Sequence, residues 1–241
     1  MGKSQSAPHV ETIGAIKVAT VAGLDTVDAK PKEDGTPRYQ DLYGRMISQA
    51  AAQGADLVLC PEYGLGMNAE PGAEAGKPLT EDMPMQKAVS EAAKKSGVAV
   101  VAQLMTWEHA SGGKKFLTLV VFERTGGVVA TYHKIYLSPI GGESSSVYAT
   151  GSADTKFNSP FCDLRLGELD IRIGLIICYE MLGFLPPPLN RKRVAELRNG
   201  GAQLLLWSAG PMATTLASKI PMYSTLRGLD KEDALPFSGW F

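Results

Sequence analysis

Residues 174–180 read GLIICYE: a run of apolar residues ends in a cysteine, and polar residues follow at once. Such a run is typical of a buried strand. Cysteine is itself often a small buried residue, so Cys178 has a plain structural interpretation as part of the core. The functional alternative is a nucleophilic thiol that a rigid sheet holds at the end of a strand. Deciding between them depends on what stands at the ends of the other strands.

Short apolar runs alternate with amphipathic stretches along the chain, and this pattern predicts an α/β fold. Strands are expected at 16–21, 56–60, 98–104, 116–122, 128–132, 169–178 and 203–207, and helices at about 38–53, 81–96 and 189–199. Two of these strands flank an ERTGG segment and predict a hairpin, so the sheets should be mixed. Residues 138–160, rich in Gly and Ser, are expected to form a loop. No break in composition marks a linker, which favours a single domain over residues 14–241 after a flexible tail of residues 1–13.

The composition argues against several classes of protein. With 24 basic and 25 acidic residues the net charge is −1, and no long basic run indicates nucleic-acid binding. Three cysteines are too few for a disulfide framework and fit a reducing compartment, so a cytoplasmic location is expected. No apolar run approaches the roughly 18 residues of a membrane span. The GLGMNA segment at 64–69 fits a dinucleotide-binding pattern, but Glu70, Pro71 and Gly72 follow where a helix should open.

The first residues of the chain, MGKSQS, fit the N-myristoylation pattern at Gly2. A short disordered polar tail is the plainer interpretation of the same residues. An acyl chain at Gly2 would give only weak membrane association, because no nearby cysteine or polybasic patch supplies a second anchor.

A carboxylate, an amine and a thiol each stand at or just beyond the end of a predicted strand. Glu62 follows the strand at 56–60, Lys134 follows the strand at 128–132, and Cys178 ends the apolar run at 174–178. A thiol needs a base to become a nucleophile, and its attack on a carbonyl or nitrile carbon builds negative charge that a fixed cation stabilises. A carboxyl group can take the thiol proton and return it to the leaving amine. The three groups are therefore sufficient to cleave a carbon–nitrogen bond.

Each of these residues also has an ordinary structural interpretation. A glutamate or a lysine after a strand is usually a solvated surface charge, and a cysteine that ends an apolar run is usually a core residue. A papain-like pair would instead need His109 or His133 as the base. His133 is adjacent to Lys134, so in an extended segment the two side chains should point to opposite faces. The three histidines of the chain are far apart and lack the spacing of zinc ligands.

Three segments resemble the nitrilase, or carbon–nitrogen hydrolase, superfamily. They are GADLVLCPEYGLG at 54–66, YHKIYL at 132–137 and GLIICYEM at 174–181. The Glu-Lys-Cys triad of that superfamily falls on Glu62, Lys134 and Cys178 in the same chain order.

The resemblance covers about residues 14–208 and implies an α-β-β-α sandwich of the nitrilase type with mixed sheets. It implies hydrolysis of a small amide, an N-carbamoyl compound or a nitrile through a cysteine thioester or thioimidate, without a metal or an organic cofactor. It also implies a dimer or larger homo-oligomer. Glu143, in SPIGGES, matches a second glutamate that positions substrate and the catalytic lysine, and Tyr179 is expected to help position substrate, with a backbone N–H nearby facing the oxyanion.

The sequence departs from the superfamily pattern after the cysteine. Glu180 stands where most members have aspartate, and residues 208–241 do not continue with the expected helix and strands, so the fold is expected to be shortened at its C-terminal end. A shortened, catalytically silent relative that acts as a binding or regulatory protein is therefore the alternative to an enzyme.

Overall fold

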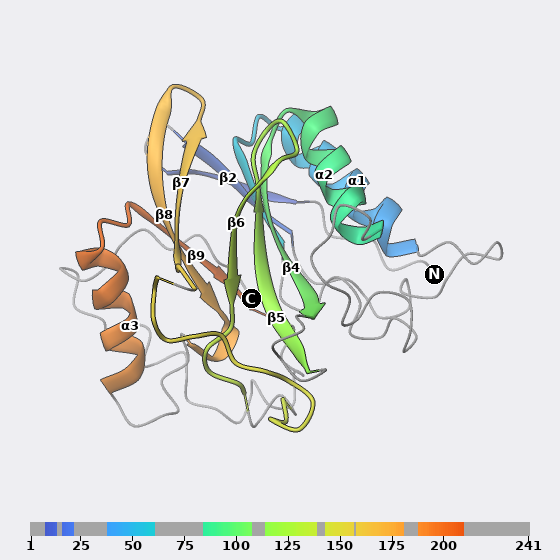
Figure 1. Ribbon diagram of the computed structural model, residues 1–241. Helices are drawn as coiled ribbons and strands as arrows, with labels where there is room; N and C mark the ends of the chain where they lie inside the picture. Colours follow the sequence, from blue (N-terminus) through green and yellow to red (C-terminus); the bar gives the residue numbers. More distant parts are fainter. Residues whose placement is uncertain are drawn as a thin grey trace, which may run out of the picture.

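The computed structural model describes residues 8–13, 16–21, 38–60, 84–107, 114–138, 143–156, 158–180 and 188–209. In these parts of the chain, two β-sheets face each other and α-helices cover their outer faces (Figure 1). This confirms the α/β class and the α-β-β-α arrangement with mixed sheets. The residues beyond 209 lie outside the described part of the chain, as do Gly2 and the GLGMNA segment at 64–69.

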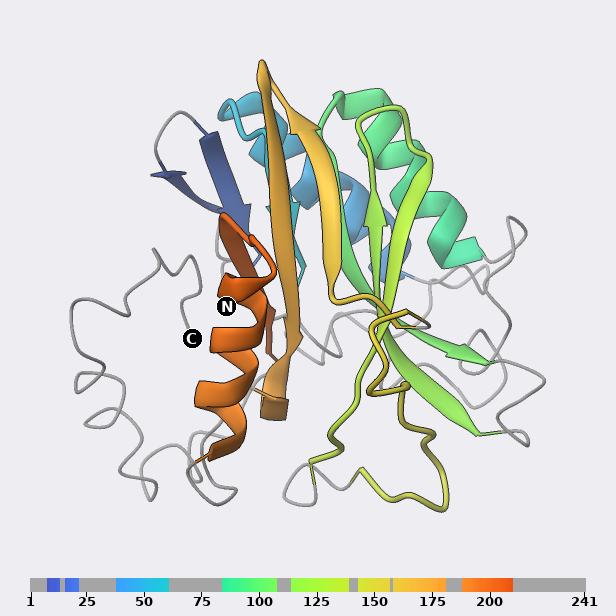
Figure 2. The ribbon, with the colours of Figure 1, turned by 60° about the vertical axis from the view of Figure 1, so that its left-hand side comes forward.

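The first sheet contains six strands in chain order. They are β1 (His9–Ile13), β2 (Ile16–Thr20), β3 (Leu57–Leu59), β4 (Ala99–Trp107), β5 (Lys115–Phe122) and β6 (Val128–His133). The neighbours β2, β3 and β4 run parallel, whereas β1, β5 and β6 each pair antiparallel with the strand before or after them. The helices α1 (Arg38–Ala52) and α2 (Pro84–Ser96) lie side by side on one face of this sheet (Figure 2).

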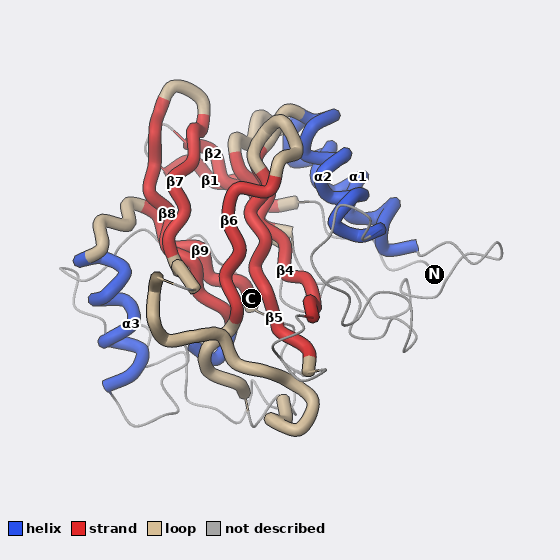
Figure 3. Tube along the Cα trace, in the orientation of Figure 1, coloured by secondary structure: helices blue, strands red, loops and turns tan. Residues whose placement is uncertain are grey.

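The second sheet contains the hairpin of β7 (Phe161–Leu166) and β8 (Leu169–Ile177), followed by β9 (Leu204–Ser208) parallel to β8. A short 3₁₀ turn, η3 (Cys178–Glu180), directly continues β8. The helix α3 (Pro188–Asn199) packs on the outer face of this sheet, on the side away from α1 and α2 (Figure 3).

The main apolar layer lies between the two sheets. It consists of Ile16, Val18, Leu57, Leu59, Ala99, Val101, Leu119, Val121, Tyr132, Cys162, Leu164, Leu166, Ile171, Ile173, Leu175, Ile177, Leu204 and Leu206. Strand β8 is buried on both of its own faces, because Leu175 and Ile177 point into this layer and Ile176 points toward α3. Burial on both faces is the reason that residues 174–178 form an unbroken apolar run.

The predicted helices and strands all occur within a few residues of their expected ends, but two strands were not predicted. The prediction of a flexible tail up to residue 13 is wrong for His9–Ile13, which pairs with β2 as an edge strand. Strand β7 was also missed, although its sequence FCDLRL alternates between buried and exposed positions. That period of two was the available signal, and the long Gly- and Ser-rich segment before it obscured it.

None of the helices in the described ranges combines the length and the apolar character that crossing a membrane requires.

Gly174 provides a test of the packing between β8 and α3. A Cβ atom at this position would lie 2.5 Å from Cδ2 of Leu205 in β9 and 3.4 Å from Cβ of Leu197 in α3. Because the space is filled, we expect Gly174→Ala to lower the free energy of unfolding by about 1–3 kcal/mol, although alanine normally suits a strand better than glycine. Urea unfolding followed by circular dichroism measures the change.

Gly44, in α1, is the matched control. A Cβ atom there would meet nothing within 4 Å, so Gly44→Ala should raise stability by about 0.5–1 kcal/mol through helix propensity. Equal and small effects of the two substitutions would contradict the close packing of β8 against α3.

Candidate active site

Cys178 stands at a sharp change in backbone direction where β8 ends. Its φ is 38°, a left-handed conformation that residues other than glycine rarely adopt. Such a conformation costs on the order of 1–3 kcal/mol and persists only where the surroundings hold it. Trp207 of β9 provides one such restraint, because its Nε1 donates a hydrogen bond of 3.0 Å to the carbonyl oxygen of Cys178. The thiol residue is partly exposed and packs against the layer between the sheets.

Lys134 follows β6 directly, and its side chain has no exposed surface. Its Nζ donates a hydrogen bond of 2.7 Å to Oε1 of Glu143. The backbone on both sides is fixed, since the N–H of Lys134 donates to Leu117 and its carbonyl accepts from Gly151, each at 2.8 Å. The ammonium group is therefore a buried cation held at a defined place.

Glu143 is buried with Lys134 and uses both carboxylate oxygens. Oε1 accepts from Lys134, and Oε2 accepts from the backbone N–H of Ser138. The backbone N–H of Glu143 donates in turn to the carbonyl oxygen of Ser138 at 3.0 Å. These bonds fix the carboxylate in the orientation that meets the ammonium group, which is the contact expected if Glu143 positions the lysine.

Glu180, the last residue of η3, was singled out in the sequence only as a departure from a pattern. In the structure its carboxylate is buried and accepts hydrogen bonds from the backbone N–H groups of Ile135 and Ile177, at 2.7 and 2.9 Å. The hydroxyl of Tyr132 donates a third bond at 2.7 Å. Burial raises the pKa of Glu180 above its ordinary value, although the bonds from Ile135, Ile177 and Tyr132 and the charge of Arg193 oppose the rise.

Glu62 lies outside the described residues, but the end of the strand that precedes it is described. Cys60 follows β3, and its carbonyl oxygen accepts a hydrogen bond of 3.0 Å from Oγ of Ser208. Ser208 is the residue of β9 that pairs with Ile177. The end of β3 in one sheet and the ends of β8 and β9 in the other therefore meet at one edge of the sandwich, toward which the arrowheads of β4, β6 and β9 point in Figure 1.

Tyr179 is buried as the middle residue of η3.

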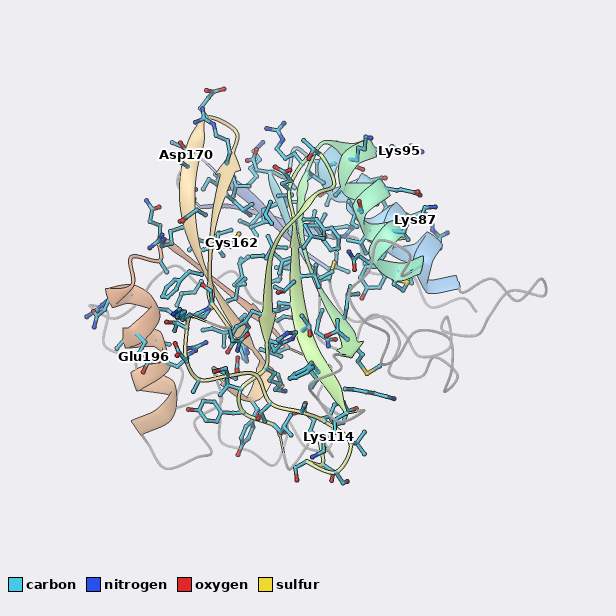
Figure 4. The ribbon with its side chains drawn as sticks, in the orientation of Figure 1. Lys87, Lys95, Lys114, Cys162, Asp170 and Glu196 are labelled. Atoms are coloured by element: carbon cyan, nitrogen blue, oxygen red, sulfur yellow. The ribbon has the colours of Figure 1, made fainter. Side chains whose placement is uncertain are left out.

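The other two thiols differ from Cys178 in their surroundings. Burial raises the pKa of Cys162 to about 11, and the neighbouring charge of Asp163 adds to the effect. Cys162 lies on β7 between the two sheets (Figure 4). Cys60 is completely buried, and burial raises its pKa further still. Of the three cysteines, Cys178 is thus the one with access to solvent.

His133 does not share the environment of Lys134. Its Nδ1 lies 2.7 Å from Oγ1 of Thr118, and its ring packs on Phe116 with 4.4 Å between ring centroids. The expectation that His133 and Lys134 point to opposite faces is consistent with these different partners. His109 lies outside the described residues. Within the described parts of the chain, no group of three His, Cys, Asp or Glu side chains could hold a metal ion.

Comparison with protein families places these residues in a known context. The model of the carbon–nitrogen hydrolase family matches residues 27–205 of the chain. The omega-amidase of Danio rerio is 28% identical over 216 residues, which are 85% of this chain and 68% of that protein. The human omega-amidase is 28% identical over 198 residues, covering 77% of this chain and 63% of its own length. The chain thus spans about two thirds of the length of these relatives.

Solved structures show the same fold at lower identity. An amidase from Nesterenkonia sp. superposes with a TM-score of 0.61 at 22% identity, over 86% of this chain and 70% of that chain. A mutant of the Nesterenkonia AN1 amidase, described as a member of the nitrilase superfamily, gives a TM-score of 0.63 at 21% identity, over 90% and 73% of the two chains. Another mutant of that amidase is described as showing the result of Michael addition of acrylamide at its active site cysteine.

The buried ion pair of Lys134 and Glu143 can be tested through stability. Glu143→Gln removes the carboxylate charge opposite the ammonium and places an amide N–H₂ group opposite either Nζ of Lys134 or the N–H of Ser138. Because removing one charge of a buried ion pair is costly, we expect the free energy of unfolding to fall by about 3–5 kcal/mol. Chemical unfolding at neutral pH measures the loss.

Glu168→Gln is the control for this experiment. Glu168 pairs with Arg165 at the exposed tip of the β7–β8 hairpin, where its side chain is 97% exposed. Solvent screens that pair, so the substitution should leave the unfolding midpoint close to that of the wild type. Similar losses for both substitutions would show that Lys134 does not depend on Glu143 in the way the geometry indicates.

Proposed function

The chain belongs to the carbon–nitrogen hydrolase family, and we propose that it hydrolyses a small non-peptide amide, an N-carbamoyl compound or a nitrile through a covalent intermediate on Cys178. The observation that carries this proposal is the position of Cys178 and Lys134. Cys178, the only partly exposed thiol of the chain, follows a strand of the second sheet. Lys134, whose ammonium group is buried and oriented, follows a strand of the first sheet. Backbone N–H groups next to both residues donate hydrogen bonds to the carboxylate of Glu180.

For an amide, the proposed reaction has two halves. Glu62 takes the proton of the Cys178 thiol, and the thiolate attacks the carbonyl carbon to form a tetrahedral intermediate. The carbon–nitrogen bond then breaks, the amine leaves with the proton from Glu62, and a thioester remains on Cys178. In the second half, Glu62 takes a proton from water, the hydroxide attacks the thioester, and the acid leaves while the thiol regains its proton.

Lys134 is proposed to stabilise the oxyanion of both tetrahedral intermediates. A fixed cation in a site with little water is effective in this role, because it needs no reorganisation when the charge develops. Its ion pair with Glu143 supports the proposal, since that pair holds the ammonium in place before any substrate binds. We propose that a backbone N–H near Tyr179 supplies a second donor.

The assignment of Glu62 as the base rests on its place in the chain. Two residues of extended chain span at most about 7 Å. Glu62 stands two residues after Cys60. The carbonyl oxygen of Cys60 accepts a hydrogen bond from Ser208, which pairs with Ile177 across β9 and β8. The resemblance to the family supports the same role. The names of the relatives favour amides as the first substrates to try, and the acrylamide adduct of the Nesterenkonia amidase favours acrylamide as a probe.

Covalent labelling tests the nucleophile. At pH 7–8 we expect acrylamide or iodoacetamide to label Cys178 well before Cys60 or Cys162, because the thiols of the latter two are buried and their pKa values are raised. Since a thiolate forms only as the pH approaches the pKa of its thiol, labelling of Cys162 should rise only near pH 11. Peptide mass spectrometry after different labelling times gives the order.

The same measurement with a slow amide substrate should show an acyl adduct on the peptide that contains Cys178. Cys178→Ala should abolish both the adduct and turnover while keeping the unfolding transition. An adduct on Cys60 would contradict the assignment. If no amide turned over and Cys178 reacted no faster than a free thiol, the chain would instead be a catalytically silent relative.

Substitution of the base gives a separate prediction. Glu62→Gln keeps the size and the hydrogen-bonding capacity of the side chain but cannot accept a proton. We expect acylation to slow by about 10²–10⁴, the usual contribution of general acid–base catalysis. Rapid-quench measurement of the acyl-enzyme on Cys178 separates this step from hydrolysis of the thioester, and acylation at the wild-type rate would rule out Glu62 as the base.

A further inference from the structure

One carboxylate connects the neighbours of both proposed reactive groups. Oε2 of Glu180 accepts from the N–H of Ile177, the residue before Cys178, at 2.9 Å. Oε1 accepts from the N–H of Ile135, the residue after Lys134, at 2.7 Å. Ile177 belongs to the second sheet and Ile135 follows the last strand of the first, so the carboxylate links the two sheets. We call this arrangement the Glu180 bridge.

We propose that Glu180 is a positioning residue, and that the Glu180 bridge sets the distance between the thiol of Cys178 and the ammonium of Lys134. This inference rests on the proposed function, because the distance matters only if the two groups act together. Glu180 itself touches no reacting atom in this scheme. It acts through the backbone on which the two groups stand.

The surroundings of Glu180 make the bridge rigid. The hydroxyl of Tyr132 donates to Oε1 and accepts from Nη2 of Arg193, both at 2.7 Å. The guanidinium carbon of Arg193 lies 5.3 Å from the centre of the Tyr132 ring. Arg193 belongs to α3, as does its second partner Glu196, which Figure 4 shows on that helix. Tyr132 of β6 thus holds the carboxylate of the Glu180 bridge directly, and Arg193 of α3 holds the hydroxyl of Tyr132.

The bridge also accounts for the backbone at Cys178. The bond from Ile177 to Glu180 closes a ring around Cys178, and the bond from Trp207 holds its carbonyl oxygen. A residue with a φ of 38° needs such restraints on both sides to keep its conformation. The side chain of Glu180 therefore fixes the turn that carries the thiol as well as its distance from the other sheet.

Glu180→Gln breaks the bridge with little change in size. Both carboxylate oxygens accept backbone N–H groups, so the amide must turn its own N–H₂ group toward either Ile135 or Ile177. With a substrate, we expect kcat to fall by about 10–100-fold while KM changes little, because binding groups stay in place and the alignment of nucleophile and cation is lost.

The pH dependence of Cys178 alkylation separates positioning from charge. Removing a nearby negative charge would by itself lower the pKa of the thiol. Moving the thiol away from the ammonium of Lys134 would raise it, by about one unit or more. The alkylation midpoint is the pH at which Cys178 reacts at half of its maximal rate. We therefore expect this midpoint to move to higher pH in Glu180→Gln. An unchanged midpoint, or one at lower pH, would overturn the proposal.

Two control variants exclude general effects. Asp163→Asn removes an exposed carboxylate from β7 of the same sheet, where it pairs with Arg172. Leu205→Ala removes a buried side chain beneath α3 and lowers stability without touching the bridge. Both should keep the wild-type alkylation midpoint at temperatures well below their unfolding transitions. A midpoint raised equally in Leu205→Ala would show that the shift reports loosening of the fold and would also overturn the proposal.

Glu180→Asp serves if the glutamine variant does not fold. It keeps the negative charge but shortens the reach by one methylene group, so it should lose one of the two backbone bonds and raise the midpoint as well. A wild-type alkylation midpoint in Glu180→Asp would contradict the proposal that the length of the Glu180 side chain positions the two groups. The alkylation measurements need no substrate, so they test the bridge even if no amide is hydrolysed, and the failure of either proposal can be recognised separately.

Discussion

The burial of β8 on both of its faces is the constraint on which the other features of the structure depend. Leu175 and Ile177 fill the space between the sheets, and Ile176 packs beneath α3. A strand enclosed in this way cannot slide or rotate without exposing apolar side chains, so its end is fixed in space. The partly exposed thiol of Cys178 gains its defined position from this buried strand, and the carboxylate of Glu180 transmits that position to the opposite sheet.

Most of the fold could be predicted from the sequence because periodicity reports burial. The apolar run at 174–178 and the period of α1 each follow from how a single element packs, which is a local property. The two missed strands show the limit of this reasoning. Strand β1 is an edge strand whose pairing with β2 decides its conformation. Strand β7 has the alternation of a strand, but the long Gly- and Ser-rich segment before it obscured this signal.

For the candidate site, too, the sequence predicted what depends on local pattern and missed what depends on contacts between distant segments. Chain order and strand ends suggested Lys134 and Cys178, and the resemblance to the family added Glu143. The structure shows the ion pair between Lys134 and Glu143. The contacts of Glu180 could not be predicted, because its partner Ile135 is 45 residues away in the chain and follows a strand of the other sheet. A glutamate two residues after a thiol has no local feature that distinguishes a buried link between sheets from a solvated side chain.

The buried pair of Lys134 and Glu143 has a consequence for engineering. Two charges enclosed in the interior lose their hydration, and well-packed apolar residues of similar volume often give equal or greater stability at such a position. Sequence changes selected for heat resistance alone would therefore tend to remove this pair, and with it the cation that we propose for the oxyanion. A library designed for robustness should hold Lys134 and Glu143 constant, since replacing both charges together need not lower stability.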